Sequence, residues 1–125
     1  MIRGCADRDE GTWLTREMID AYERMHRLGF GHRVEAWLGD TLAGGIYGIA
    51  IGGLFAGESM FSKISDGSKI ALVFLTEHLR RQGFQLFDSQ FLNDHTQRMG
   101  AIEISRAEYL ARLKKALACR VRFTP

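Results

Sequence analysis

The chain has 125 residues, 46% of them apolar, and a formal net charge of +2 at pH 7. This length suits a single domain over residues 1–125, and this apolar content provides a packed core and argues against disorder. The small net charge is not diagnostic of a nucleic-acid-binding protein, although residues 111–123 are locally basic. No apolar run is long enough to span a bilayer, and the first thirteen residues lack the apolar segment of a secretory signal, so we expect a cytoplasmic protein.

The first half of the chain predicts one helix followed by three strands. Thr15 can cap a helix that runs to about Leu28, with Gly29 as its stop. Alternating apolar and polar residues then predict a strand over 32–38, a turn at 39–40, and two further strands over 41–53 and 54–61. The second strand is rich in glycine, which weakens a strand interior, so we expect a bulge there or a close approach by another backbone or a ligand.

The second half predicts a helix that starts after Ser65 or Asp66, a short strand over 84–91, a helical turn over 93–99, and a last helix that begins with a capping box at Ser105. Consecutive strands with short turns indicate an antiparallel meander, and the helix before the fourth strand indicates a crossover connection. The expected fold class is therefore α+β, with a mixed, mainly antiparallel sheet flanked by helices.

Several common catalytic motifs are not supported by the sequence. Ser59 sits in a segment that resembles a nucleophile elbow, but Phe61 stands where the last glycine belongs and no helix follows at once. The four histidines lack metal-ligand spacing, and no glycine-rich phosphate loop is present. Segments 80–83 and 97–101 echo the pyrophosphate loop of acetyl-CoA enzymes, but their glycines stand where helices stop. We therefore expect neither a metal nor a cofactor.

Polar residues in apolar company are the more informative feature. Glu58 lies inside the apolar strand over 54–61, and burial of an unpaired carboxylate costs on the order of several kcal/mol. Its partner is then either a basic side chain of the fold, such as Arg106, or a cationic ligand from outside. Asp88 and Gln90 are two residues apart, which places both on the same sheet face as Leu86. That face is either the wet side of an edge strand or the end of a strand at a site.

At this point the sequence resembles a known family over nearly all of its length. The matching stretches, in family order, are GTWLT, AYERMHRLGFGHRVEAW, LAGGIYGIAIGGLFAGESMFS, DGSKIAL, FDSQFLNDHT and MGAIEISRAEYL. They resemble the leucyl/phenylalanyl-tRNA–protein transferases, bacterial enzymes of the N-end rule pathway of protein degradation. The resemblance implies a GNAT-like acyltransferase fold. It also implies transfer of leucine, phenylalanine or, less readily, methionine from an aminoacyl-tRNA to the N-terminal Arg or Lys of an acceptor protein, without ATP, metal or other cofactor.

The resemblance also implies roles for individual residues. Asp88 and Gln90 match the catalytic D-x-Q pair, Glu58 matches an acidic position in G-E-S-M-F, and Trp13 matches an aromatic residue placed near the terminal adenosine of the tRNA. The apolar pocket for the transferred side chain maps onto Ile46, Phe55 and Leu72. Because an amide is hardly basic, we expect Gln90 to orient the acceptor amine by hydrogen bonding and to be oriented in turn by Asp88.

The chain also departs from the family pattern. Ser89 stands where the family usually has Cys, and the family's separate N-terminal domain, which helps to bind the tRNA acceptor stem, is expected to be absent. Phosphate contacts dominate nucleic-acid affinity, so tRNA binding is expected to be weaker unless other basic residues substitute. The candidates are Arg98, Lys114, Lys115, Arg120 and Arg122. Two alternatives stay open: an acyltransferase of the same fold that uses acyl-CoA, and a non-catalytic remnant that binds tRNA or peptide.

Overall fold

The computed structural model describes residues 15–90 and 92–124. Its elements follow the expected order of a helix, three strands, a helix, a strand and two final helices. They are α2 (Arg16–Arg27), β1 (Gly31–Leu38), β2 (Thr41–Ile51), β3 (Leu54–Ser62), α3 (Gly67–Gln82), β4 (Leu86–Asp88), α4 (Asp94–Arg98) and α5 (Arg106–Ala118).

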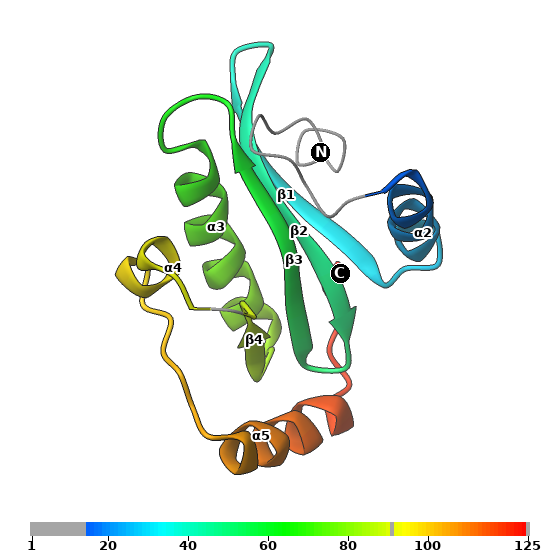
Figure 1. The fold of residues 1–125 in the computed structure, drawn as a ribbon. Coiled ribbons are helices and arrows are strands. Elements are labelled where there is room, and N and C mark those ends of the chain that lie inside the picture. Colours follow the sequence, from blue (N-terminus) through cyan, green and yellow to red (C-terminus); the bar gives the residue numbers. More distant parts are fainter. Residues whose placement is uncertain (1–14, 91, 125) are drawn as a thin grey trace.

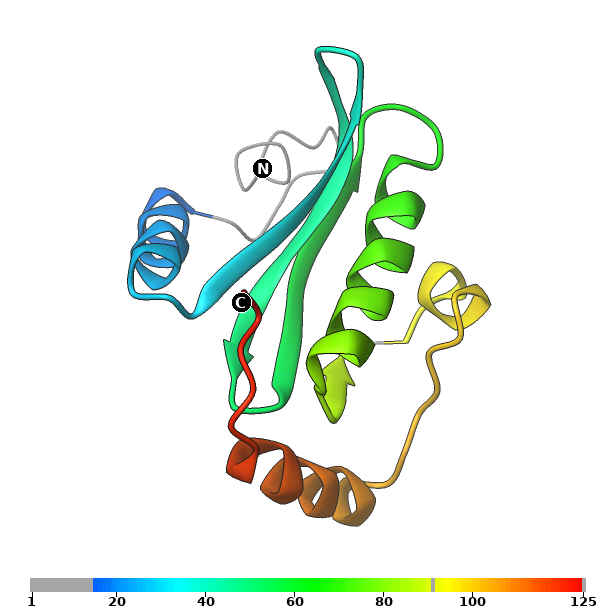
Figure 2. The same ribbon diagram turned by 180° about the vertical axis from the view of Figure 1, so that it is seen from behind.

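The four strands form one mixed sheet in the order β1-β2-β3-β4. β2 is antiparallel to both β1 and β3, and β4 runs parallel to β3 after the crossover through α3. Figures 1 and 2 show α2 and α3 on opposite sides of this sheet. The expected α+β class with a mixed, mainly antiparallel sheet is confirmed, and the arrangement is compatible with a GNAT-like fold.

Two neighbouring residues of β2 show how the two sides of the sheet are packed. Successive side chains of a strand point to opposite faces. Ile46 packs with Phe55 and the buried residues of α3 in the main core. Tyr47 packs with Tyr22 and other residues of α2 on the opposite side.

The glycine-rich strand β2 has the close contacts that its composition predicts. The register of β2 against β3 shifts between Tyr47 and Gly48. A Cβ atom at Gly48 would lie 2.2 Å from the carbonyl oxygen of Ala56 and 2.7 Å from the ring of Phe55. The expected bulge and close backbone approach are therefore both present.

The cap of α2 agrees with the sequence prediction, and the start of α3 differs from it. The capping box predicted at Ser105 forms only in half, because the Glu108 side chain bonds Arg112. The Thr15 and Ser105 side chains accept hydrogen bonds from the first turns of α2 and α5. Asp66 occupies the N-cap position of α3 but makes no capping hydrogen bond with its side chain. Instead, the hydroxyl of Ser62, at the end of β3, accepts from the backbone N–H of Ser68 at 2.8 Å. The predicted cap from Ser65 or Asp66 is wrong because the strand that precedes the loop supplies the acceptor.

The fourth strand is shorter than predicted. β4 comprises only Leu86–Asp88 and pairs with Leu54, Phe55 and Ala56 of β3. β3 continues beyond this pairing to Ser62. From Gly57 onward, the edge of β3 opposite β2 therefore has no strand beside it in the described residues.

No helix within residues 15–90 and 92–124 combines the length and apolar character needed to cross a membrane.

The substitution Gly48→Ala tests the close approach in β2. The added methyl group has no room between the Ala56 carbonyl and the Phe55 ring, so we expect the free energy of unfolding to fall by about 1–3 kcal/mol, measured by urea denaturation. Gly57→Ala is the matched control, because its Cβ would meet only ordinary contacts, the nearest at 3.4 Å from Phe87. Equal stability of the two variants would contradict the packing described for Gly48.

Candidate active site

A large cavity lies beside the free edge of β3. Its volume is about 900 Å³, within the range usual for ligand pockets of roughly 300–1,000 Å³. β3, α3, β4, the segment that contains α4, and α5 all contribute to its wall. The cavity therefore opens where β4 stops and β3 continues with only β2 paired to it. Its apolar wall includes Ile46, Met60, Leu72, Phe87, Leu92 and Met99.

The polar part of the wall starts with a turn at the end of β4. The backbone N–H of Gln90 donates to Oδ1 of Asp88 at 2.8 Å. Gln90 has φ +67°, in the left-handed region that a non-glycine residue rarely adopts. A short Asp side chain that bonds the backbone two residues later stabilises such a turn. Asp88 thus fixes the direction in which Gln90 leaves the strand, as expected from the sequence, although the predicted strand geometry does not extend to Gln90.

The side chain of Gln90 then reaches back to β3. Its Nε2 donates to the carbonyl oxygen of Gly57 at 2.9 Å and to Oε2 of Glu58 at 3.3 Å. The bond to Gly57 satisfies a backbone acceptor at the point where the pairing of β3 with β4 has ended. The Gln90 side chain therefore links the segment just after β4 to β3, at the point where the two strands stop pairing.

Two tyrosines complete the hydrogen bonding of the carboxylates. The Tyr22 hydroxyl, from α2, donates to Oε2 of Glu58 at 3.0 Å. The Tyr109 hydroxyl, from α5, donates to Oδ2 of Asp88 at 2.6 Å. Burial and then the bond to Glu58 raise the pKa of Tyr22 to about 12. The bond to Asp88 and then burial raise the pKa of Tyr109 to about 12. Both hydroxyls are therefore protonated donors at neutral pH.

Neither carboxylate is neutralised by a basic side chain of the described part of the chain. The ion pairs there are Arg33–Glu35, Lys69–Asp66 and Arg112–Glu108. Arg106 lines the same cavity but forms no ion pair with Glu58, so the internal partner considered from the sequence is not the one observed. Phenol and amide donors satisfy a carboxylate without cancelling its charge. Within the described residues, Glu58 and Asp88 therefore have no ion-pair partner beside the apolar surface of the cavity. The same wall also carries Glu103, Arg106 and Arg112, and Arg112 is paired with Glu108.

The structure brings most of the predicted site residues together. Glu58, Asp88 and Gln90 line the cavity, as do Ile46 and Leu72. Phe55 does not; it is fully buried behind the wall, with its ring centroid 5.6 Å from that of Phe87, which does line the cavity. Trp13 lies outside the described residues.

Tyr22 and Tyr109 are the site residues that sequence reasoning missed. Both fall on the apolar faces of the predicted first and last helices, a position that by itself indicates only packing. A signal was available, since a tyrosine on a buried face usually needs a hydrogen-bond partner for its hydroxyl. The partner itself is 36 residues away for Tyr22 and 21 for Tyr109, so no local pattern identifies it.

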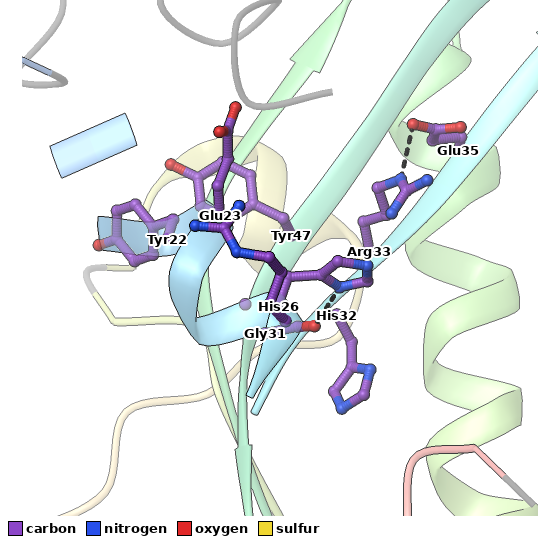
Figure 3. A pocket seen from close by; sticks show the side chains of 10 residues that line it. Tyr22, Glu23, His26, Gly31, His32, Arg33, Glu35 and Tyr47 are labelled. Carbon is purple, nitrogen blue, oxygen red and sulfur yellow. Dashed lines mark hydrogen bonds and ion pairs between the residues drawn. The ribbon is translucent and has the colours of Figure 1, made fainter. Parts of the chain in front are cut away.

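A second, smaller pocket of about 320 Å³ lies between α2 and the strands β1 and β2. Figure 3 shows that Arg33 bonds Glu35, and that His26 bonds the backbone of Gly31, within its wall. Burial lowers the pKa of His32, which also lines this pocket, and so favours its neutral form. The pocket contains two acidic and two basic side chains, whereas the wall of the large cavity contains three acidic and two basic ones. The charged members of the smaller pocket are Glu23, Arg27, Arg33 and Glu35.

The described residues contain no group of three or more His, Cys, Asp or Glu side chains that could hold a metal ion.

Comparison with known proteins shows which family this chain resembles. The family model described as leucyl/phenylalanyl-tRNA protein transferase matches residues 1–114. The chain belongs to this family.

Curated members of the family are closely similar over nearly the whole chain. The leucyl/phenylalanyl-tRNA–protein transferase of Anaeromyxobacter sp. (strain K) is 54% identical over 121 residues, which are 94% of this chain and 52% of that protein. The proteins of the same name from Dinoroseobacter shibae and Herpetosiphon aurantiacus are each 51% identical, over 99% and 98% of this chain and 55% and 63% of their own lengths. The chain therefore spans about half to three fifths of the length of these relatives.

The two tyrosine–carboxylate pairs predict an unusual alkaline titration in this family member. The pKa values of Tyr22 and Tyr109 are raised from 10.0 to about 12, so their contribution to stability is fully present below pH 10 and is lost as the pH rises through 12. Near-ultraviolet absorbance of tyrosinate should show two tyrosines that ionise near pH 12, and Tyr22→Phe and Tyr109→Phe should each remove one. Ionisation of both near pH 10 would contradict the two hydrogen bonds.

Proposed function

We propose that residues 1–125 act as one catalytic domain of an aminoacyltransferase that moves leucine, phenylalanine or methionine from an aminoacyl-tRNA to the N-terminal Arg or Lys of an acceptor protein. This reaction marks the acceptor for degradation by the N-end rule in the cytoplasm. The observation that carries the proposal is the pair of carboxylates, Glu58 and Asp88, held by neutral donors on the wall of a cavity with an apolar side. The family membership and the names of the relatives support it.

The chemistry requires positioning more than activation. The aminoacyl ester of the donor is already activated, so the neutral α-amine of the acceptor attacks the ester carbonyl carbon directly. The new C–N bond forms, the C–O bond to the ribose breaks, and the proton lost by the nitrogen ends on the released ribose oxygen. A reaction of this kind gains most from holding the amine close to the carbon in the correct orientation.

The polar wall suits an acceptor that carries two cationic groups. An N-terminal Arg or Lys brings its side-chain cation next to the α-amino group, and Glu58 and Asp88 offer two separate charges to receive them. The amide oxygen of Gln90 accepts no hydrogen bond from a described residue and can accept one from the acceptor amine. Gln90 would then orient the nitrogen lone pair toward the ester, in the direction that Asp88 sets.

The apolar wall suits the side chain of the transferred residue. Ile46 and Leu72 are almost fully buried and line the cavity from β2 and α3. Phe55 supports this wall from behind through its contact with Phe87. A methylene difference alone discriminates by only about 1–3 kcal/mol, so exclusion of β-branched residues must come from the fixed shape of this wall.

The donor tRNA also needs contacts for its phosphates. The basic residues considered for this role are all exposed on or near α4 and α5, and α5 contributes Arg106, Tyr109 and Arg112 to the cavity wall. A phosphate backbone that follows α5 would bring the ester end of the donor toward the carboxylates. The proposed phosphate contacts are Arg98, Lys114, Lys115, Arg120 and Arg122.

The substitution Glu58→Gln tests whether the charge of Glu58 binds a cationic group of the acceptor. It keeps an oxygen for the Tyr22 hydroxyl but removes the charge, so we expect kcat/KM for an Arg-initiated peptide to fall about 10- to 100-fold, the loss usual for a charge-assisted hydrogen bond of about 1.5–3 kcal/mol. The same variant should change transfer to a peptide that starts with a neutral residue by less than about threefold. The measurement is transfer of labelled leucine or phenylalanine from tRNA by the 125-residue chain.

The controls for this assay separate the alternatives. Glu77→Gln, an exposed residue of α3 outside the cavity wall, should retain full activity, and Asp88→Ala should abolish transfer. Equal losses for Arg-initiated and neutral peptides in Glu58→Gln would contradict a charge-reading role for Glu58. Transfer only from acetyl-CoA would favour the acyl-CoA alternative, and binding without turnover would favour a non-catalytic remnant.

A further inference from the structure

Tyr109 contacts Asp88 but has no role in the reaction proposed above. It lies on α5, close to the end of the chain, and its side chain reaches the cavity wall. Its hydroxyl donates to Oδ2 of Asp88, while the other oxygen of the same carboxylate accepts from the backbone of Gln90. The two oxygens of Asp88 therefore have separate partners, one from a distant helix and one from the turn that aims Gln90.

The short bond to Tyr109 constrains the carboxylate. An O–H···O⁻ bond of 2.6 Å is of the charge-assisted kind, which is stronger and more directional than a bond between neutral groups. β4 ends at Asp88, so the strand itself holds this residue only on its N-terminal side. The side chain of Asp88 is thus fixed mainly by its two hydrogen bonds.

The helix that carries Tyr109 is itself anchored to the sheet. The side chain of Ser105 caps its first turn, and the carbonyl oxygen of Ala116 near its end accepts from the backbone N–H of Gly53, in the turn between β2 and β3, at 2.7 Å. Ala116 is fully buried. α5 therefore offers Tyr109 as a fixed point against which the end of β4 can be held.

We propose that Tyr109 is a positioning residue of the active site: it holds the Asp88 carboxylate through Oδ2 so that Oδ1 keeps Gln90 in its left-handed turn, with the Gln90 amide facing the acceptor amine. This inference rests on the proposed transferase function for its catalytic consequence. The arrangement of Asp88 and Gln90 that it describes is a property of the fold and can be measured without activity.

A phenol suits this role better than a basic side chain. A Lys or Arg at position 109 would hold Asp88 equally well but would neutralise the charge that the acceptor needs. The Tyr109 hydroxyl fixes the carboxylate and leaves its charge in place. Loss of this hydroxyl should consequently spare the attraction of the acceptor, which sets KM, and impair the orientation of the amine, which sets kcat.

The variant Tyr109→Phe removes the hydroxyl and keeps the ring. In the full chain we expect kcat for transfer to an Arg-initiated peptide to fall about tenfold or more, with KM changed by less than about twofold. The backbone amide signal of Gln90 in a two-dimensional NMR spectrum should shift, and its hydrogen exchange should become faster. Ala111→Gln, at an exposed position on the same helix that does not line the cavity, is the matched control and should change neither quantity.

A double-mutant cycle tests whether Tyr109 acts through Asp88. In an Asp88→Ala background, Tyr109→Phe should produce no further change in the Gln90 amide signal, because the link between the two residues is already broken. A second variant, Tyr109→Gln, supplies a neutral N–H donor and should recover part of the lost kcat, which packing alone would not do. If Tyr109→Phe loses its native circular dichroism spectrum, Tyr109→Met, which also lacks a donor, takes its place in these comparisons.

The outcomes are distinguishable. Unchanged kcat or an unchanged Gln90 amide in Tyr109→Phe would overturn the positioning role, and so would a full additional shift in the Asp88→Ala background. If the wild-type chain transfers nothing from aminoacyl-tRNA, the proposed function fails. The Gln90 amide then decides the positioning role alone: a shift on loss of the hydroxyl supports it and an unchanged signal refutes it.

Discussion

The site depends on two carboxylates that are hydrogen-bonded but not paired with any basic side chain of the part of the chain that the structure describes. Glu58 accepts from a tyrosine and an amide, and Asp88 from a tyrosine and a backbone N–H. A half-buried carboxylate needs donors to offset its loss of water, and an arginine would supply them while cancelling the charge. Neutral donors offset part of the free-energy cost of removing the carboxylate from water, and they leave its negative charge in place. The charge therefore stays available to a cation that arrives in the cavity, which is the property the proposed reaction uses.

A strand that stops early creates the space in which these groups meet. β4 pairs with three residues of β3 and ends, whereas β3 runs on to Ser62. The backbone acceptors of an unpaired edge need other partners, and the Gln90 side chain takes the carbonyl of Gly57. The Gln90 amide therefore satisfies the first backbone acceptor beyond the β3–β4 pairing and also forms part of the cavity wall. Extension of β4 by two residues would satisfy the same edge but would turn Gln90 into an ordinary strand residue.

Sequence patterns predicted the elements well because the determinants are local. Apolar periodicity, glycine stops and the Thr15 and Ser105 caps all act within a few residues of the chain. The convergence of Asp88 and Gln90 was predicted from the two-residue period of a strand, but the structure achieves it with a left-handed turn at Gln90. Tyr22 and Tyr109 were missed because helical periodicity shows that a side chain faces inward and not which group it meets. The Ser62 cap of α3 was missed for the same reason.

Among the described residues, the hydrogen bonds that arrange Glu58, Asp88 and Gln90 join groups between residues 22 and 109. Affinity for a tRNA is a separate requirement, because it depends on phosphate contacts distributed over a surface. In the proposed reaction the geometry that orients the acceptor amine and the surface that holds the donor are therefore physically separable. A defect in donor binding would raise the concentration of aminoacyl-tRNA that the reaction needs while leaving the choice of acceptor, set by the two carboxylates, unchanged.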